Sequence, residues 1–266
     1  MFYSTSAILL VAFAAAGSSV VAQSLSQGCE AGLAGLALNS DASCLNVQGL
    51  VGVLAAGDNT SLVDPINTWL GGFCSQPQCS NDTLASVVNT VTTACSAELS
   101  SFGLTNVSPA QLSSLVQSLF PVAKGVACLQ DQSNNTLCAT ETLRGYETVN
   151  GPFTVDALTK LLGEIKGSAV PPSVPQSTEC SSCAKQAYNV LTQQFPGVIN
   201  SDAQQNIQQT CGADFTDGQT PSGVSSTANT ALQNSDTSNT SGAVTSVSGA
   251  AGAVLSILAT FFAVAV

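Results

Sequence analysis

The sequence predicts an all-α, disulfide-stapled head followed by a disordered, Ser/Thr-rich stalk. Apolar residues recur at helical spacing along residues 23–218, whereas alternating strand patterns are scarce. Ten cysteines lie in the same stretch, an even number that suits a disulfide framework. After about Gly218 the chain becomes rich in Ser, Thr, Asn and Gly. That composition cannot bury a core, so we expect a flexible stalk at residues 219–241.

The N-terminal segment has the pattern of a secretory signal peptide. Residues 7–16 form an apolar run of suitable length, and Val20 and Ala22 place short side chains where a signal peptidase needs them. We therefore expect residues 1–22 to be removed, leaving Gln23 as the first residue. No Lys or Arg precedes the apolar run, so its positive charge is only the free amine. The alternative is a buried N-terminal helix, against which the downstream cysteines argue.

Helical patterns follow one another through the head. Apolar spacing predicts helices at residues 30–37, 45–55, 82–99, 136–147 and 181–194.

A further helix has a clear start. Ser108 supplies an N-cap and Pro109 a favourable first-turn proline, before an apolar stripe that runs from Leu112 to Phe120. Pro121 is expected to kink or end this helix, because proline lacks the N–H that an interior position donates.

Two more helices are bounded by local signals. Thr154 can cap a helix that has one apolar face and closes at Gly167. Ser201 precedes a helix that is expected to stop at Cys211 and Gly212, since glycine favours helix ends.

The spacing of the cysteines suggests two related halves, residues 23–112 and 113–218. Each half has two separated cysteines, a close pair and a final one, and residues 61–70 resemble residues 153–162. Five cysteines cannot pair completely within one half. If all are oxidised within one molecule, at least one bridge must join the halves. The ten are Cys29, Cys44, Cys74, Cys79, Cys95, Cys128, Cys138, Cys180, Cys183 and Cys211.

Charge excludes several function classes. The chain has 16 acidic and five basic residues and a net charge of −11. All five basic residues lie between Lys124 and Lys185. No basic stripe exists to release counterions from phosphates, so a nucleic-acid role is excluded. Adhesion of the polypeptide to anionic headgroups is disfavoured for the same reason.

The chemistry available to an active site is narrow, because the chain has no histidine. Ser-His-Asp and Cys-His nucleophilic sites and histidine-based metal sites are therefore excluded. Catalysis by a pair of carboxylates needs no histidine and remains possible. Asp64 and Asp156 are the candidates, because they occupy equivalent places in the two similar segments. Both precede helical patterns, where an acid stabilises the helix dipole. We favour that structural role and expect no catalytic residue, no cofactor and no metal.

Two close cysteine pairs invite other interpretations. Cys180 and Cys183 match a C-x-x-C redox pair, but a Pro-rich loop rather than a hydrophobic strand precedes them. We expect each to form a bridge elsewhere. A zinc site would need Cys74 and Cys79 as the second pair, which oxidising export disfavours.

Five N-glycosylation sequons accompany the cysteines. We expect the four within the head to be exposed to solvent. The five sequons begin at Asn59, Asn81, Asn106, Asn134 and Asn239.

The C-terminal segment matches a signal for glycosylphosphatidylinositol (GPI) attachment. Residues 250–266 form a short apolar tail diluted by Gly and Ala, with no basic residue after it. A transmembrane helix needs about 20 apolar residues and usually a charged flank. Small residues and an uncharged spacer precede the tail, as GPI attachment requires. We expect attachment at Ser241, with Asn239 and Gly242 as alternatives and residues 242–266 as the propeptide. A weak single-pass anchor is the other interpretation.

The layout as a whole resembles the cysteine-rich, Ser/Thr-tailed GPI proteins of fungal cell surfaces. The shared features are the Val-Val-Ala cleavage site, the ten-cysteine helical body, the Ser/Thr-rich segment 219–248 and the apolar C-terminal tail. The resemblance implies a location and no active site.

We therefore expect a non-enzymatic extracellular glycoprotein, held by a GPI lipid at the outer leaflet of the plasma membrane or in the cell wall. A structural, adhesive or masking role follows, with cell-wall polysaccharide as a partner. The first alternative is a carrier or sensor of an apolar ligand such as a lipid, because disulfide-stapled helices can enclose one. The second is a carboxylate hydrolase that uses Asp64 and Asp156.

Overall fold

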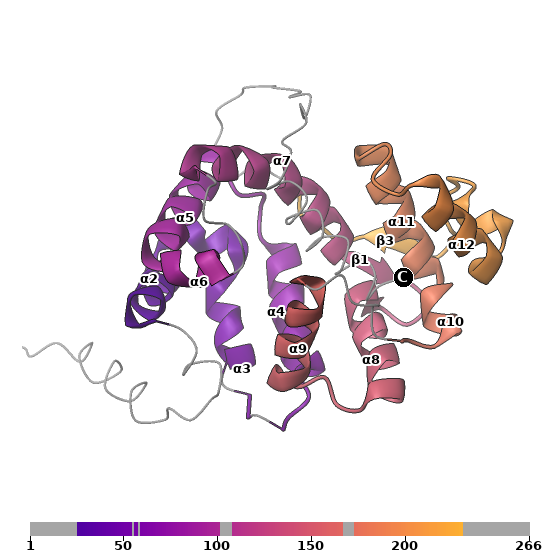
Figure 1. The fold of residues 1–266 in the computed structure, drawn as a ribbon, viewed down its shortest axis with the longest axis horizontal. Helices are drawn as coiled ribbons and strands as arrows, with labels where there is room; N and C mark the ends of the chain where they lie inside the picture. Colours follow the sequence, from indigo (N-terminus) through magenta and orange to yellow (C-terminus); the bar gives the residue numbers. More distant parts are fainter. Residues whose placement is uncertain (1–25, 55, 58, 102–107, 167–172, 231–266) are drawn as a thin grey trace, which may run out of the picture.

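The computed structural model describes residues 26–54, 56–57, 59–101, 108–166 and 173–230 (Figure 1). The expected signal peptide, the sequons at Asn106 and Asn239, the attachment residue Ser241 and the propeptide 242–266 lie outside these residues. The described part is mainly helical and carries five disulfides, as the sequence predicts.

The elements described in the first half are all helices. In order along the sequence they are α2 (Gln27–Leu38), η1 (Ser40–Leu45), η2 (Val47–Leu50), α3 (Val51–Leu54), α4 (Val63–Ser75), α5 (Asn81–Ala94) and α6 (Ser96–Ser101), where η marks a 3₁₀ helix.

Two of the expected helices are interrupted. Residues 45–54, the described part of the stretch 45–55, form short 3₁₀ and α turns, because Asn46 takes a left-handed conformation with φ of 50°. The Asn46 side chain donates to the carbonyl oxygen of Trp69 at 2.9 Å, which holds this turn against α4. The stretch 82–99 divides into α5 and α6 at Cys95.

The second half adds three short strands. Its elements are α7 (Pro109–Ala127), β1 (Leu129–Asp131), β2 (Thr136–Leu137), α8 (Cys138–Asn150), α9 (Val155–Lys166), α10 (Gln176–Glu179), α11 (Ser182–Gln194), α12 (Ser201–Cys211), η3 (Ala213–Thr216) and β3 (Val224–Ser226).

The start of α7 confirms the N-cap predicted at Ser108, whereas the length of α7 shows that the helix does not end at Pro121. Ser108 and Gln111 form a capping box, in which each side chain binds the other residue's backbone N–H. The helix does not end at Pro121 but continues to Ala127. A proline inside a helix costs about 3 kcal/mol. Packing offsets this cost, since Leu119 before Pro121 and Lys124 after it are both buried.

The start of α9 and the end of α12 agree with the local signals, the start of α12 is shifted by one residue, and Gly167, the expected end of α9, lies outside the described residues. Thr154 caps α9, where its hydroxyl accepts from the N–H of Ala157 at 3.3 Å. Asn200, rather than Ser201, caps α12 by accepting from the N–H of Ala203 at 2.8 Å. At the other end of α12, Gly212 has a φ of 89°, which a residue with a side chain rarely adopts.

A three-stranded antiparallel sheet, in the order β2-β1-β3, is the element that the sequence analysis misses. Gln130 pairs with Leu137 on one side and with Ser225 on the other. Strands of two or three residues are too short to show an alternating pattern.

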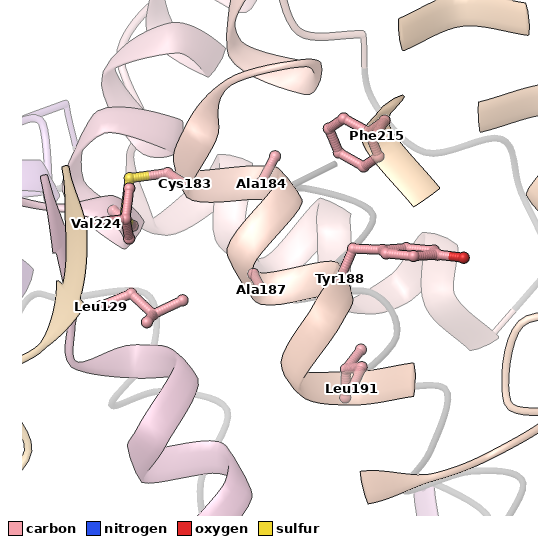
Figure 2. Close-up of a cluster of buried hydrophobic side chains, with 9 residues drawn as sticks. Leu129, Cys183, Ala184, Ala187, Tyr188, Leu191, Phe215 and Val224 are labelled. Atoms are coloured by element: carbon pink, nitrogen blue, oxygen red, sulfur yellow. A yellow bond between two sulfur atoms is a disulfide. The ribbon is translucent and has the colours of Figure 1, made fainter. Parts of the chain in front are cut away.

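The third strand corrects the expected start of the stalk. β3 lies within residues 219–241, yet Val224 is buried and belongs to the core that surrounds α11. Figure 2 shows Val224 beside the Cys183 disulfide and above Leu129, opposite the face of α11 that carries Ala184 and Ala187. Residues 219–229 are therefore part of the head.

The two halves do not form separate cores. The expected boundary between residues 112 and 113 falls inside α7, which contacts α5 at one end and α11 at the other (Figure 1). One buried cluster joins Leu62 and Val63 of the first half to Tyr146 and Phe153 of the second. The described head is therefore built around shared cores.

The two similar segments, 61–70 and 153–162, lie against each other. The N–H of Leu62 donates to the carbonyl oxygen of Phe153 at 2.8 Å. The equivalent residues Val63 and Val155 are buried in the same cluster. The internal resemblance therefore corresponds to a contact between the starts of α4 and α9.

All ten cysteines form disulfides. Two bridges lie within each half. Cys74–Cys128 joins the halves and pairs the cysteine left over in each. Cys29–Cys95 staples α2 to α5, and Gly32 allows their close approach, since a Cβ there would lie 2.4 Å from Ala94 Cβ. The bridges are Cys29–Cys95, Cys44–Cys79, Cys74–Cys128, Cys138–Cys183 and Cys180–Cys211.

Replacement of Pro121 by alanine is expected to stabilise the head. Pro121→Ala restores a backbone donor inside α7 and removes a helix-breaking ring, so the free energy of unfolding should rise by about 1–3 kcal/mol. Pro109→Ala is the matched control, because proline is already favourable at the first position and should give no such gain. Chemical denaturation measures both variants, and a loss of stability in Pro121→Ala would contradict the account of α7.

Candidate functional site

The carboxylates considered for catalysis lie on the surface. Asp64 and Asp156 each occupy the first turn of a helix, α4 and α9. Asp64 pairs with Arg144 at 3.4 Å, and their side chains are 84% and 58% exposed. Asp156 is exposed as well. Both positions suit an acid that stabilises the positive end of a helix dipole.

The two close cysteine pairs are both divided between different bridges. Cys180 bonds to Cys211, whereas Cys183 bonds to Cys138. Cys74 and Cys79 likewise bond to Cys128 and Cys44. None of these pairs is a C-x-x-C redox couple or a set of thiolate ligands in the oxidised protein.

A cluster of Cys29, Cys95 and Glu98 brings three ligand atoms within 4.8 Å of one another. Both sulfur atoms are in a disulfide, so they offer no thiolate to a metal. The Glu98 carboxylate accepts from the backbone N–H of Ser26, and this hydrogen bond lowers the pKa of Glu98. The cluster therefore holds the start of α2 against α6.

The C-terminal ends of α4 and α7 meet at the only bridge between the halves. We call this place the junction and define it by Cys74, Lys124, Cys128, Thr227 and Asn229. The last carbonyl groups of a helix have no partner within the helix. At the junction, groups far along the sequence supply those partners.

Lys124 lies at the centre of the junction and is completely buried. Its ammonium donates to the carbonyl oxygens of Gln76 at 2.6 Å and Pro77 at 3.0 Å, just beyond the end of α4. It also lies 5.2 Å from the centre of the Phe73 ring, within the range of a cation–π interaction. Burial lowers the pKa of Lys124. Among the residues that the structure describes, no carboxylate forms an ion pair with it.

The segment that follows β3 closes the junction. The N–H and hydroxyl of Thr227 donate to the carbonyl oxygen of Cys128, at 2.8 and 3.0 Å. Asn229 donates through its N–H to the carbonyl oxygen of Cys74 at 2.9 Å and through its side chain to that of Ser75 at 3.1 Å. Asn229 therefore completes the C-terminal end of α4.

The sequence predicts bridges for Cys74 and Cys128 but no role for the other junction residues. Asn229 lies in the expected stalk, and Lys124 stands out only as one of five basic residues. One signal was available: Lys124 follows Phe120 by four residues, so it shares the apolar face of its helix. A lysine on such a face is either solvated at its tip or buried with partners.

Three sequon asparagines are described, and all three are exposed: Asn59, Asn81 and Asn134. Asn134 lies in the turn between β1 and β2, where its side chain donates to the carboxylate of Glu141.

Three basic residues, Lys124, Arg144 and Lys185, contribute differently to the charge of the surface. Lys124 is buried, and Arg144 pairs with Asp64. Lys185 donates to Asp217 at 2.8 Å, and this hydrogen bond lowers the pKa of Asp217. Lys124 therefore offsets no acidic group on the surface, whereas Arg144 and Lys185 each offset one carboxylate.

None of the described helices is both long enough and apolar enough to cross a bilayer. Comparison with known proteins finds no matching protein family, no matching curated protein and no matching solved structure.

Replacement of Lys124 tests the energetic role of the junction. Lys124→Met keeps the length of the side chain but leaves the carbonyl oxygens of Gln76 and Pro77 without their donor. Each lost hydrogen bond to a charged group costs about 1.5–3 kcal/mol, so for the two bonds we expect a loss of about 3–6 kcal/mol in the free energy of unfolding.

Arg144→Met is the matched control, because an exposed ion pair contributes about 0–1 kcal/mol. Denaturant titration of both variants measures the difference. Equal stabilities would show that Lys124 does not hold the junction.

Proposed function

We propose that the protein is a non-enzymatic extracellular glycoprotein, displayed at the cell surface or in the cell wall on a GPI-anchored stalk. The observation that supports this most is the pairing of all ten cysteines in five disulfides. Such a framework forms and persists in oxidising compartments outside the cytosol. The exposure of Asn59, Asn81 and Asn134 suits glycans added during export.

The proposed mechanism is display of a covalently fastened head. Bridges within each half hold neighbouring helices, and the Cys74–Cys128 bridge prevents the halves from separating. Because residues 219–229 belong to the head, we place the root of the stalk near Thr230 rather than at residue 219. The stalk would then run to the attachment residue, for which we propose Ser241, with Asn239 and Gly242 as alternatives.

A structural, adhesive or masking role agrees with the surface. Its excess of acidic groups gives no support for binding to anionic polymers, and glycans at exposed sequons would cover part of the head. Cell-wall polysaccharide is the partner that we propose. Asp64 and Asp156 lie exposed on helix starts, which supports a structural role for both rather than hydrolysis.

The anchor is tested by enzymatic release. Cells that express the full-length protein are treated with a phospholipase specific for phosphatidylinositol, and we expect the protein to pass from the membrane fraction into the soluble fraction. A variant that ends at Ser241 is the control, since without residues 242–266 it should be secreted without treatment. Retention of the treated full-length protein at the membrane would contradict the GPI anchor.

Native mass spectrometry of the released protein separates display from ligand transport. Display predicts the mass of residues 23–241 with five disulfides, N-glycans and the remnant of the anchor. A co-purified lipid bound to the head would instead favour a carrier or sensor of an apolar ligand.

A further inference from the structure

The segment Gly223–Asn229 forms a strap across the junction. Its first residue accepts from the N–H of Gln132 at 2.8 Å, and β3 then pairs along β1. After β3, Thr227 and Asn229 bind the carbonyl oxygens of Cys128 and Cys74, the two cysteines of the inter-half bridge. One short segment thus connects both ends of a single disulfide.

The strap also covers the apolar surroundings of this bridge. Cys74 and Cys128 belong to one buried cluster, against which Ala228 of the strap packs. The two cysteines are 3% and 0% exposed. In contrast, Cys180 and Cys211 are only partly buried.

We propose that the strap is a latch that controls access of external thiols to the Cys74–Cys128 bridge. Reduction begins when a thiolate of the reductant attacks one sulfur atom and forms a mixed disulfide, while the S–S bond breaks and the other cysteine leaves as a thiolate. A second thiol of a dithiol reductant then displaces the first cysteine and becomes oxidised to a cyclic disulfide. The attacking sulfur needs direct access to the bridge, which the docked strap denies.

Among the segments that surround the Cys74–Cys128 bridge, the strap can detach at the lowest cost in free energy. Helices α4 and α7 are held in place because they are long, because they carry buried residues, and because the bridge joins them to each other. The strap is an edge segment in which Val224 is buried but Ser225 and Ser226 are exposed, and no cysteine follows Cys211 to fasten it. Segments with few buried contacts open locally without global unfolding.

The coupling acts in both directions. The intact bridge fixes the distance between the carbonyl groups of Cys74 and Cys128, so it presents both acceptors to the strap at once. Reduction frees the two helix ends to separate and weakens the binding of the strap. If the proposed display function holds, tension on the stalk reaches Thr230 first and favours the open strap; the latch itself does not depend on the anchor.

The test is site-resolved reduction of the full-length protein, purified from an exporting host. The oxidised protein is incubated with dithiothreitol, samples are quenched with an alkylating reagent, and each bridge is quantified by peptide mass spectrometry. In the wild type we expect Cys180–Cys211 to be reduced before Cys74–Cys128.

The double variant Thr227→Pro, Asn229→Pro removes the two backbone donors and the two side-chain donors that these residues direct at the helix ends. Loss of these four hydrogen bonds should speed reduction of Cys74–Cys128 by roughly tenfold or more, with no change at Cys29–Cys95 in the opposite part of the head. Thr230→Pro is the matched control, because this exposed residue follows the strap, and it should behave as the wild type.

Three outcomes would overturn the latch: an unchanged rate at Cys74–Cys128 in the double variant, an equal acceleration of all bridges, or reduction of Cys74–Cys128 before Cys180–Cys211 in the wild type. If the double variant does not fold, Asn229→Ala replaces it in the same reduction experiment. It removes the side-chain donor to Ser75, keeps the backbone donor to Cys74, and should give a smaller acceleration confined to the same bridge.

Discussion

The meeting of two helix ends at the Cys74–Cys128 bridge is the constraint on which the rest of the head depends. Helices α4 and α7 both finish there with carbonyl groups that their own backbones cannot satisfy. An unsatisfied buried carbonyl costs about 1–3 kcal/mol, so distant donors must be brought to the place. Lys124 and Asn229 are those donors at the end of α4, and Thr227 is the donor at the end of α7. The bridge, the buried cation and the C-terminal strap therefore require one another.

A lysine buried without a carboxylate is unusual, because desolvation of an ammonium is costly. At the junction the cost is reduced by three features of the site. Two carbonyl oxygens accept from the ammonium, the negative end of the α4 dipole faces it, and the ring of Phe73 offers its electron-rich face. The protein has only five basic residues, so the burial of Lys124 removes one positive charge from the surface and leaves the surface more acidic.

The same geometry supports the proposed display of the head. The stalk would leave the head at the bridge between the halves, so a pull on the stalk acts on both halves through a covalent connection. Four further bridges close stretches within the halves, two in each half. Each bridge limits the unfolded ensemble, which helps a head whose cores are small and divided into several clusters.

The sequence by itself determined the features that depend on neighbouring residues. The caps at Ser108 and Thr154 and the all-α class follow from local hydrogen bonds and apolar spacing, and the need for a bridge between the halves follows from counting. Tertiary structure decided the rest. The choice of Cys128 for Cys74, the burial of Lys124 and the docking of β3 depend on groups that are distant along the sequence and meet only when the helices pack. Composition could not distinguish the strap from the stalk because its contribution comes from backbone donors, which every residue but proline carries.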